Sequence, residues 1–508
     1  MKEDKLLSKL KTDFEFVKKW KDEQTATEGA ADVARKIREE YFNKLVAYRR
    51  WYEGDQWSVY PDGTLMDTTN DVIKPTINLI KIIIDQQHSL LKRRKMICQT
   101  RPVEQADIVN ARAIEDVVKF VWKQKDIQAA IAAVDKDSLI YGAGFLKTRW
   151  TEENDLSFDI INPLNFYPDK YGNTIDEMRY VVIALEKTAE YIRYKYDKEE
   201  SADDKGRVVV YESWYNHSID FPKGLYALWT DKQILKQSTL DDVNPAKNIP
   251  ICAFIHNKMS NSFWGISEVK NLAEVQLIHN KTLGFILDNL ALTNNCEYIT
   301  TDDKFAKDGL INRPGSIHLA DDLNNIKPLP QPMISPQWFS ILSYSGYGLM
   351  QQVSGTYAVN LGGASQTDTA SGIIALQQAG GAIVESNFQD IAKECKRLVK
   401  IILSYLYAFK KKDLLDMTDE EVDFNKINLD RDIFIEFSDA YPEDKVTRIN
   451  MFVQMMQLPP DKLKIIAQLM GDVELLEYAT QAEKQAQEMQ QMMLAAQGQQ
   501  AKGGGNNG

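Results

Sequence analysis

The sequence predicts an α+β fold in which helices come first and a meandering sheet second. Apolar residues recur every three or four positions over roughly the first 140 residues, which is the spacing of helices that pack one face against a core. Over residues 145–256, short stretches alternate apolar and polar residues between turn residues, as antiparallel strands do. Two long helical patterns follow. Because the chain has 508 residues, we expect two to four domains.

Composition narrows the classes of function. The formal net charge is −12 and the pI about 5.2, so a basic surface that wraps nucleic acid is not expected. The four cysteines lie far apart without a CxxC pair, which favours reduced thiols over disulfides. No apolar run approaches the ~20 residues of a membrane helix, and the charged N-terminus lacks a signal peptide's apolar core. We therefore expect a protein without a membrane partner that stays inside a cell or inside a particle assembled there.

Five helices are expected before the sheet. Trp51 and Trp57 flank a turn and are interpreted as a packed aromatic corner. A helix is expected to start near Thr76 or Asn78, after an extended Lys-Pro step. The expected ranges are 1–27 (loosely docked), 28–51, 76–95, 104–124 and 126–141, the last of which breaks at Gly142 and Gly144.

The central region predicts short strands joined by turns. One short helix is expected at 187–196, and the many aromatic residues of this region are most simply core. The expected strands are 145–150, 156–161, 165–168, 178–184, 207–216, 224–230 and 250–256.

A long helix is expected from Ile266 to about Thr293. Its apolar band is so wide that we expect neighbouring elements on more than one side. Lys270 and Lys281 are 11 residues apart, close to three turns, so they share one face roughly 16 Å apart along the axis.

Residues 354–371 are expected to form a loop between two further helices. Gly355 and the Gly362–Gly363 pair interrupt it, and no period of 2 or 3.6 survives. A helix over 336–353 precedes it, and a long helix that is interrupted and kinked at Gly380–Gly381 follows. The remaining expectations are strand-like pieces EYIT and SIHLA within 294–334, a strand at 430–437, helices over 444–497 and a disordered tail.

Sequence signatures of catalysis are missing. The glycine-rich loop lacks the Walker A lysine, and neither HExxH nor GxSxG occurs. The five histidines show no ligand spacing, and acidic pairs such as Asp302–Asp303 are typical of solvated faces. We therefore predict no catalytic residue, no metal site and no cofactor, and we do not expect an enzyme.

Four segments in order carry a family resemblance. They are YRRWYEGDQW with KPTINLIKIIIDQQHSLL, then SLIYGAGFLKTRW with FDIINPLNFYPD, then WGISEVKNLAEVQLIHNKTLGFILDNL, then GTYAVNLGGASQTDTASGIIALQQAG. Their joint order over about 30–440 resembles the portal (head-to-tail connector) proteins of tailed bacteriophages. The resemblance implies a portal fold with a mixed α/β wing, a long-helix stem, a small β-containing clip and a C-terminal helical crown. The implied ranges are wing 1–255, stem helix 256–293, clip 294–334, second stem helix 335–353, tunnel loop 354–371, wing helix and return strand 372–440, crown 441–497 and disordered tail 498–508.

The same resemblance implies a role and partners. A ring, usually of twelve subunits, would sit at one capsid vertex of the virion after assembly in the host cytoplasm. Double-stranded DNA would pass through it during packaging and genome ejection, and an acidic conduit would let phosphates slide. Implied partners are the terminase large subunit, a head-tail adaptor protein, and the major capsid and scaffolding proteins.

Candidate DNA-channel residues follow from the loop and the stem. Small neutral groups in the loop could contact passing phosphates, whereas the two stem lysines face either the channel or a neighbouring subunit or solvent. Two other functions stay open: another ring-forming virion protein such as an adaptor, and a metal-dependent phage nuclease. The candidates are Gly355, Asn360, Gly362, Gly363, Gln366, Thr367, Lys270 and Lys281.

Overall fold

A computed structural model describes most of the first 409 residues and one later strand. The described residues are 3–23, 40–67, 73–93, 96–102, 108–169, 171–260, 262–294, 298–301, 303, 307, 326–328, 335–355, 370–409 and 433–439. The expectations for 28–39, 316–320, 441–497 and 498–508 lie outside them. The chain divides into two compact units, Met1–Ser438 and Asp439–Gly508, and nearly all described residues belong to the first.

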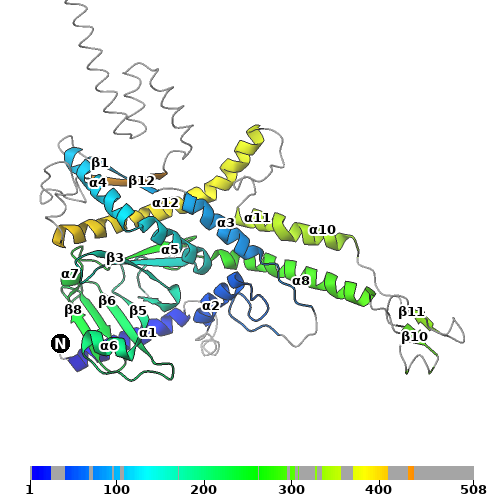
Figure 1. The fold of residues 1–508 in the computed structure, drawn as a ribbon, viewed down its shortest axis with the longest axis horizontal. Coiled ribbons are helices and arrows are strands. Elements are labelled where there is room, and N and C mark those ends of the chain that lie inside the picture. The colour runs from blue at the N-terminus through cyan, green and yellow to red at the C-terminus, as the bar shows by residue number, and fades with distance from the viewer. Residues whose placement is uncertain are drawn as a thin grey trace, which may run out of the picture. The chain divides into compact units, whose positions relative to one another are not determined.

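The expected N-terminal helices are present (Figure 1). Asn78 caps one of them, since its Oδ1 accepts a hydrogen bond from Lys81 N at 3.1 Å. Gly142 ends another with a left-handed φ of 89°, as its position in the sequence predicted. The helices are α1 (Glu3–Glu23), α2 (Glu40–Glu53), α3 (Leu79–Arg93), α4 (Ile108–Gln124) and α5 (Ile127–Tyr141).

Two antiparallel sheets form the central region. The three-stranded sheet has the order β3-β2-β9, and the five-stranded sheet follows chain order from β4 to β8. The strands are β2 (Ala143–Trp150), β3 (Leu156–Ile161), β4 (Phe166–Pro168), β5 (Tyr180–Thr188), β6 (Arg207–Tyr215), β7 (Leu225–Trp229), β8 (Ile234–Ser238) and β9 (Ile251–Ile255). The short helix predicted at 187–196 is α6 (Ala189–Tyr196), whereas β8 and α7 (Leu240–Val243) were not predicted.

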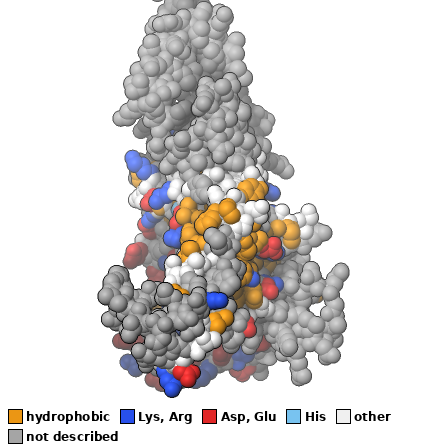
Figure 2. Space-filling model, turned by 90° about the vertical axis from the view of Figure 1, so that its right-hand side faces the viewer, with side chains coloured by type: hydrophobic (Ala, Val, Ile, Leu, Met, Phe, Trp, Pro, Cys, Tyr) orange, Lys and Arg blue, Asp and Glu red, His pale blue; other side chains and the backbone are white. Residues whose placement is uncertain are grey.

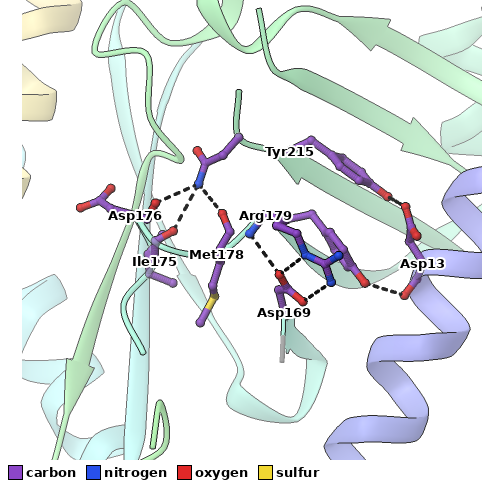
Figure 3. A network of polar contacts seen from close by, with 9 residues as sticks. Asp13, Asp169, Ile175, Asp176, Met178, Arg179 and Tyr215 are labelled. Carbon is purple, nitrogen blue, oxygen red and sulfur yellow. Dashed lines mark hydrogen bonds and ion pairs between the residues drawn. The ribbon is translucent and has the colours of Figure 1, made fainter. Parts of the chain in front are cut away.

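The first helix is not loosely docked, which corrects the sequence expectation. Its Leu6, Leu10 and Phe14 are buried against the five-stranded sheet. The Phe14 ring meets the ring of Trp229 edge-on at 6.0 Å. Figure 3 shows the polar side of this junction, where Asp13 accepts a hydrogen bond of 2.9 Å from the hydroxyl of Tyr215. The apolar stripe at every fourth residue therefore makes α1 part of the core.

A second acidic residue, Asp169, lies beside that junction. Asp169 has a fully buried side chain and receives two hydrogen bonds from the Arg179 guanidinium, at 2.8 and 2.9 Å (Figure 3). The backbone N–H of Arg179 donates a third at 3.1 Å. The charge of Asp169 is thus satisfied although no water reaches it.

The elements after the sheets include two corrections. The helix expected over 336–353 is divided into α10 (Gln337–Ser343), a π-type turn η5 (Tyr344–Gly348) that is kinked at the non-helical Gly346, and α11 (Leu349–Ser354). The long helix α12 (Ala370–Phe409) runs through Gly380–Gly381 without the predicted interruption. The remaining elements are α8 (Glu268–Asn294), β10 (Tyr298–Thr300), β11 (Ile326–Pro328), β1 (Met96–Pro102) and β12 (Ile433–Asp439).

Strand pairing joins segments that are distant in sequence. β10 pairs antiparallel with β11, and β1 pairs with β12 across more than 300 residues. The pieces EYIT and 430–437 were predicted as strands, but β1 and β11 were not. Of the helices described, none is both long enough and apolar enough to span a bilayer.

Candidate functional site

The candidate site is a pair of helical segments that lead to the predicted loop. α8 packs against α10, η5 and α11 on one side and against α2, α3 and α5 on another. This confirms that its wide apolar band meets neighbours on more than one side. The antiparallel strand pair β10–β11 lies between the two segments in sequence (Figure 1). We call α8 with α10, η5 and α11 the stem pair, a name taken only from the ranges 256–293 and 335–353 that the sequence resemblance led us to expect as stem helices.

Buried amides fix α8 to the N-terminal helices. Gln276 and Asn280 lie one turn apart on α8 and are fully buried. Gln276 Oε1 accepts hydrogen bonds from the backbone N–H groups of Leu79 and Ile80, at 2.9 and 3.2 Å, so α8 caps the start of α3. Asn280 Nδ2 donates to Gln56 Oε1 at 2.6 Å. Sequence reasoning did not single out these residues, although two amides inside an apolar helical band were a visible signal.

The start of the predicted loop is held at the base of the stem pair. Gln87 of α3 donates from Nε2 to the carbonyl of Ser354 and to Glu268 Oε1, both at 3.3 Å. His256 lies 3.5 Å from Glu268 Oε2, and both side chains are almost fully buried. Gly355 ends α11 in the left-handed region, with φ of 64°. The loop therefore starts from a fixed point that the sequence alone did not identify.

Beyond that base the stem pair exposes large apolar side chains. Of the α10 side chains, all of which are described, none is buried, and in α8 the last buried residue is Ile286. Figure 2 shows hydrophobic side chains gathered on the side that carries these helices. The exposed residues and fractions are Ile278 51%, Phe285 52%, Leu292 50%, Trp338 39%, Phe339 53%, Ile341 49% and Tyr344 59%.

The two candidate lysines lie on one exposed stripe of α8, as their spacing predicted. Lys281 is flanked on this stripe by the half-exposed Ile278 and Phe285. Lys270 lines a cleft of about 1030 Å³ together with Glu274 of α8, with residues of α2, and with Tyr60 of the segment that follows α2.

Most loop candidates fall outside the described residues: Asn360, Gly362, Gly363, Gln366 and Thr367. Of the loop candidates, the structure places Gly355 alone. Within the described ranges, no three His, Cys, Asp or Glu side chains gather so that they could hold a metal ion. The described part of the site thus consists of helix surfaces, buried amides and one buried His–Glu pair.

Comparison with known families assigns the chain to a class. The family model of the phage P22-like portal protein matches residues 28–221, and that of the phage SU10 portal protein matches residues 176–502. The protein is therefore a phage portal protein, a structural component of the virion. Because the second match spans more than half of the chain, the protein belongs to the phage SU10 portal protein family. A search of curated proteins gave no match. The portal family also implies a ring-forming oligomer in the capsid.

Proposed function

We propose that copies of this chain form a ring at one capsid vertex and that genome DNA passes through it during packaging and ejection. The observation that carries the proposal is the exposed apolar surface of the stem pair, at the distal half of α8 and on α10. In a ring built by a heterologous contact, each copy covers a surface of the next. The proposal assigns the stem pair to such a contact.

The physical argument rests on helix stability. A seven-residue helix without a buried side chain has too few hydrogen bonds to be stable by itself in water. Full burial of a large apolar side chain contributes ~1.5–3 kcal/mol, so covering the exposed half of each contributes about 1 kcal/mol. Seven such side chains, at about 1 kcal/mol each, supply a large part of the free energy that stabilises an obligate interface. Packing by neighbouring copies therefore adds to the stability that α10 gains from α8 and η5 of its own chain.

The domain roles follow the family resemblance. We assign the sheets and α1–α5 to the wing, the stem pair to the stem, β10–β11 to the clip and residues 441–497 to the crown. The clip would meet the terminase large subunit during packaging and a head-tail adaptor protein afterwards. The capsid vertex, with major capsid and scaffolding proteins, would hold the wing. The host cytoplasm would be the place of assembly.

The channel would be lined by the loop 354–371 and part of the stem. Asn360, Gln366 and Thr367 are neutral groups suited to transient phosphate contact, because the loop carries no cation. We place Lys281 against a neighbouring copy rather than in the channel, since the side chains of Ile278 and Phe285 beside it are apolar and half exposed. The adaptor and nuclease alternatives have no comparable observation in their favour.

Electron microscopy of the purified chain tests the proposal. The wild type should give rings with a central hole. Phe285→Asp with Phe339→Asp should abolish them, because two carboxylates would be buried in the contact at a cost of several kcal/mol. The control is Ile219→Asp, at a fully exposed isoleucine away from the stem pair, which should keep wild-type rings. Rings from the double variant, or monomers from the wild type in several buffers, would overturn the assignment.

A further inference from the structure

The second helix of the stem pair is broken by a turn whose geometry the sequence did not predict. In η5 the backbone N–H of Leu349 donates to the carbonyls of Gly346, three residues back, and of Tyr344, five residues back, instead of to the residue four back. Gly346 has ψ of −112° within this turn, while the flanking Ser343 and Leu349 are helical. One residue more than an α-helix needs is therefore accommodated between α10 and α11.

A side chain from the facing helix occupies the space beside this turn. A Cβ on Gly346 would lie 3.1 Å from Cε1 and 3.3 Å from Nδ1 of His279, which is tighter than ordinary contact. His279 belongs to α8 and its side chain is buried. Gly348, two residues on, has open space where its Cβ would be. The imidazole of His279 therefore occupies the space that a side chain at position 346 would need, whereas position 348 has room for a side chain.

The extra residue sets which face α10 presents. An α-helix turns by about 100° per residue, so removal of the π-turn would rotate α10 by that angle relative to α11. In the observed register the Trp338 ring meets the ring of Phe285 on α8 edge-on, with centroids 6.2 Å apart. Rotation would carry Trp338 away from Phe285 and bring other exposed side chains of α10 to α8.

The energetic cost of that rotation is small within one chain. None of the seven α10 side chains is buried, so the helix gives up little buried apolar area when it changes face. α11, by contrast, is held by the fully buried Met350 and by Ser354 at its end. α11 is thus fixed and α10 is weakly held, and a turn with two possible hydrogen-bond registers joins these two helices.

We propose that Tyr344–Gly348 is a two-state register hinge in which His279 holds the π-turn register and its withdrawal lets α10 rotate. The role for the stem rests on the proposed portal function: a rotated α10 presents a different surface to the neighbouring copy and to the channel. The hinge itself is a property of one chain and is tested without DNA or partners.

Crosslinking within the full-length chain reports the register. Cysteines replace Phe285 and Trp338, with Cys296 changed to serine, and a short bismaleimide joins them where the observed register holds. Gly346→Ala should lower the crosslink yield by about tenfold, since its methyl group conflicts with His279 and favours the continuous α-helix. Gly348→Ala is the matched control and should leave the yield unchanged. His279→Ala should also lower the yield, because the side chain that holds the observed register is gone.

Equal yields for Gly346→Ala and Gly348→Ala, or a wild-type yield for His279→Ala, would overturn the hinge. Hydrogen exchange of the wild-type chain gives a second test that needs no variant. Amides of α10 and η5 should exchange at least about tenfold faster than those of α11. Uniformly slow exchange over 337–354 would also refute the hinge. If the hinge test fails but electron microscopy shows rings, the hinge is refuted and the proposed portal function still holds.

Discussion

One buried ion pair between the two sheets provides the sharpest stability prediction. Lys147 of β2 and Glu212 of β6 have 8% and 4% side-chain exposure, and their Nζ and Oε2 atoms are 2.7 Å apart. Trp214 Nε1 also donates to Glu212 Oε1 at 3.2 Å. A second carboxylate, Asp159, lies 3.6 Å from Lys147 Nζ but is 36% exposed. The Lys147–Glu212 pair is therefore removed from water, and the partly exposed Asp159 gives Lys147 a second, weaker ionic partner.

The perturbation is Glu212→Gln, which keeps the shape of the side chain and removes its charge. Loss of one partner of a buried pair costs about 3–5 kcal/mol, and we expect about 3 kcal/mol because Asp159 still faces Lys147. Lys147→Met with Glu212→Leu removes both charges and should return the chain to within about 1 kcal/mol of wild type. Arg207→Met, which breaks the exposed pair with Glu186, is the control and should cost less than about 1 kcal/mol.

Urea unfolding followed by tryptophan fluorescence measures these differences. The slope is about 1–3 kcal/mol/M for small proteins and rises with chain length, so in a chain of 508 residues a loss of 3 kcal/mol lowers the midpoint by up to about 1 M. If Glu212→Gln unfolds at the wild-type midpoint, the pair contributes nothing and the reasoning from burial is wrong. A double variant as unstable as the single one would show instead that packing, and not charge, sets the loss.

Two further predictions concern the N-terminal helices. Phe14→Ala should weaken the docking of α1 by about 3–5 kcal/mol, because a buried ring beside Trp229 is lost, and limited trypsin digestion of α1 should accelerate. Glu15→Ala on the exposed face of α1 should leave the digestion unchanged, and equal rates for both variants would contradict the docking. Burial raises the pKa of Asp137 to about 6 against the opposing effects of Lys136 and Arg49. Since the folded pKa lies above the unfolded one, this group's stabilising contribution is complete below about pH 4 and is lost as pH rises to about 6. Asp137→Asn should therefore flatten the stability profile between these values, and a wild-type slope retained in Asp137→Asn would refute the assignment.

Most helices and strands could be predicted from the sequence because the apolar spacing that indicates them is a local pattern. Asn78 and Gly142 marked helix ends that the structure confirms. The misses have physical reasons. β1 and β11 are strands through pairing with distant segments, which no local pattern records. The helix expected over 336–353 divides at Gly346, where His279 of another helix lies against the turn, a contact that no local pattern records. α1 is firmly docked because aromatic residues of a later sheet receive it.

The candidate site was predictable to a smaller degree. The shared face of Lys270 and Lys281 followed from helical geometry, and the structure places both on one exposed stripe. Their apolar neighbours on that stripe were visible in the sequence, but their exposure was not, since exposure depends on which side of α8 the rest of the chain covers. Gln87, which holds the start of the loop through Ser354, gave no sequence signal because its partners lie more than 180 residues away.

The sequence by itself determined the α+β class, the bounds of most elements and, through the order of four segments, the resemblance to phage portals that the family comparisons bear out. These properties depend on local periodicity and on residue order, both of which a single chain records. Tertiary structure decided how α8 is anchored by buried amides, where the loop begins, and that the distal stem pair has an apolar surface which its own chain leaves exposed. These properties depend on contacts between residues far apart in sequence, and burial is settled only when every neighbour is in place.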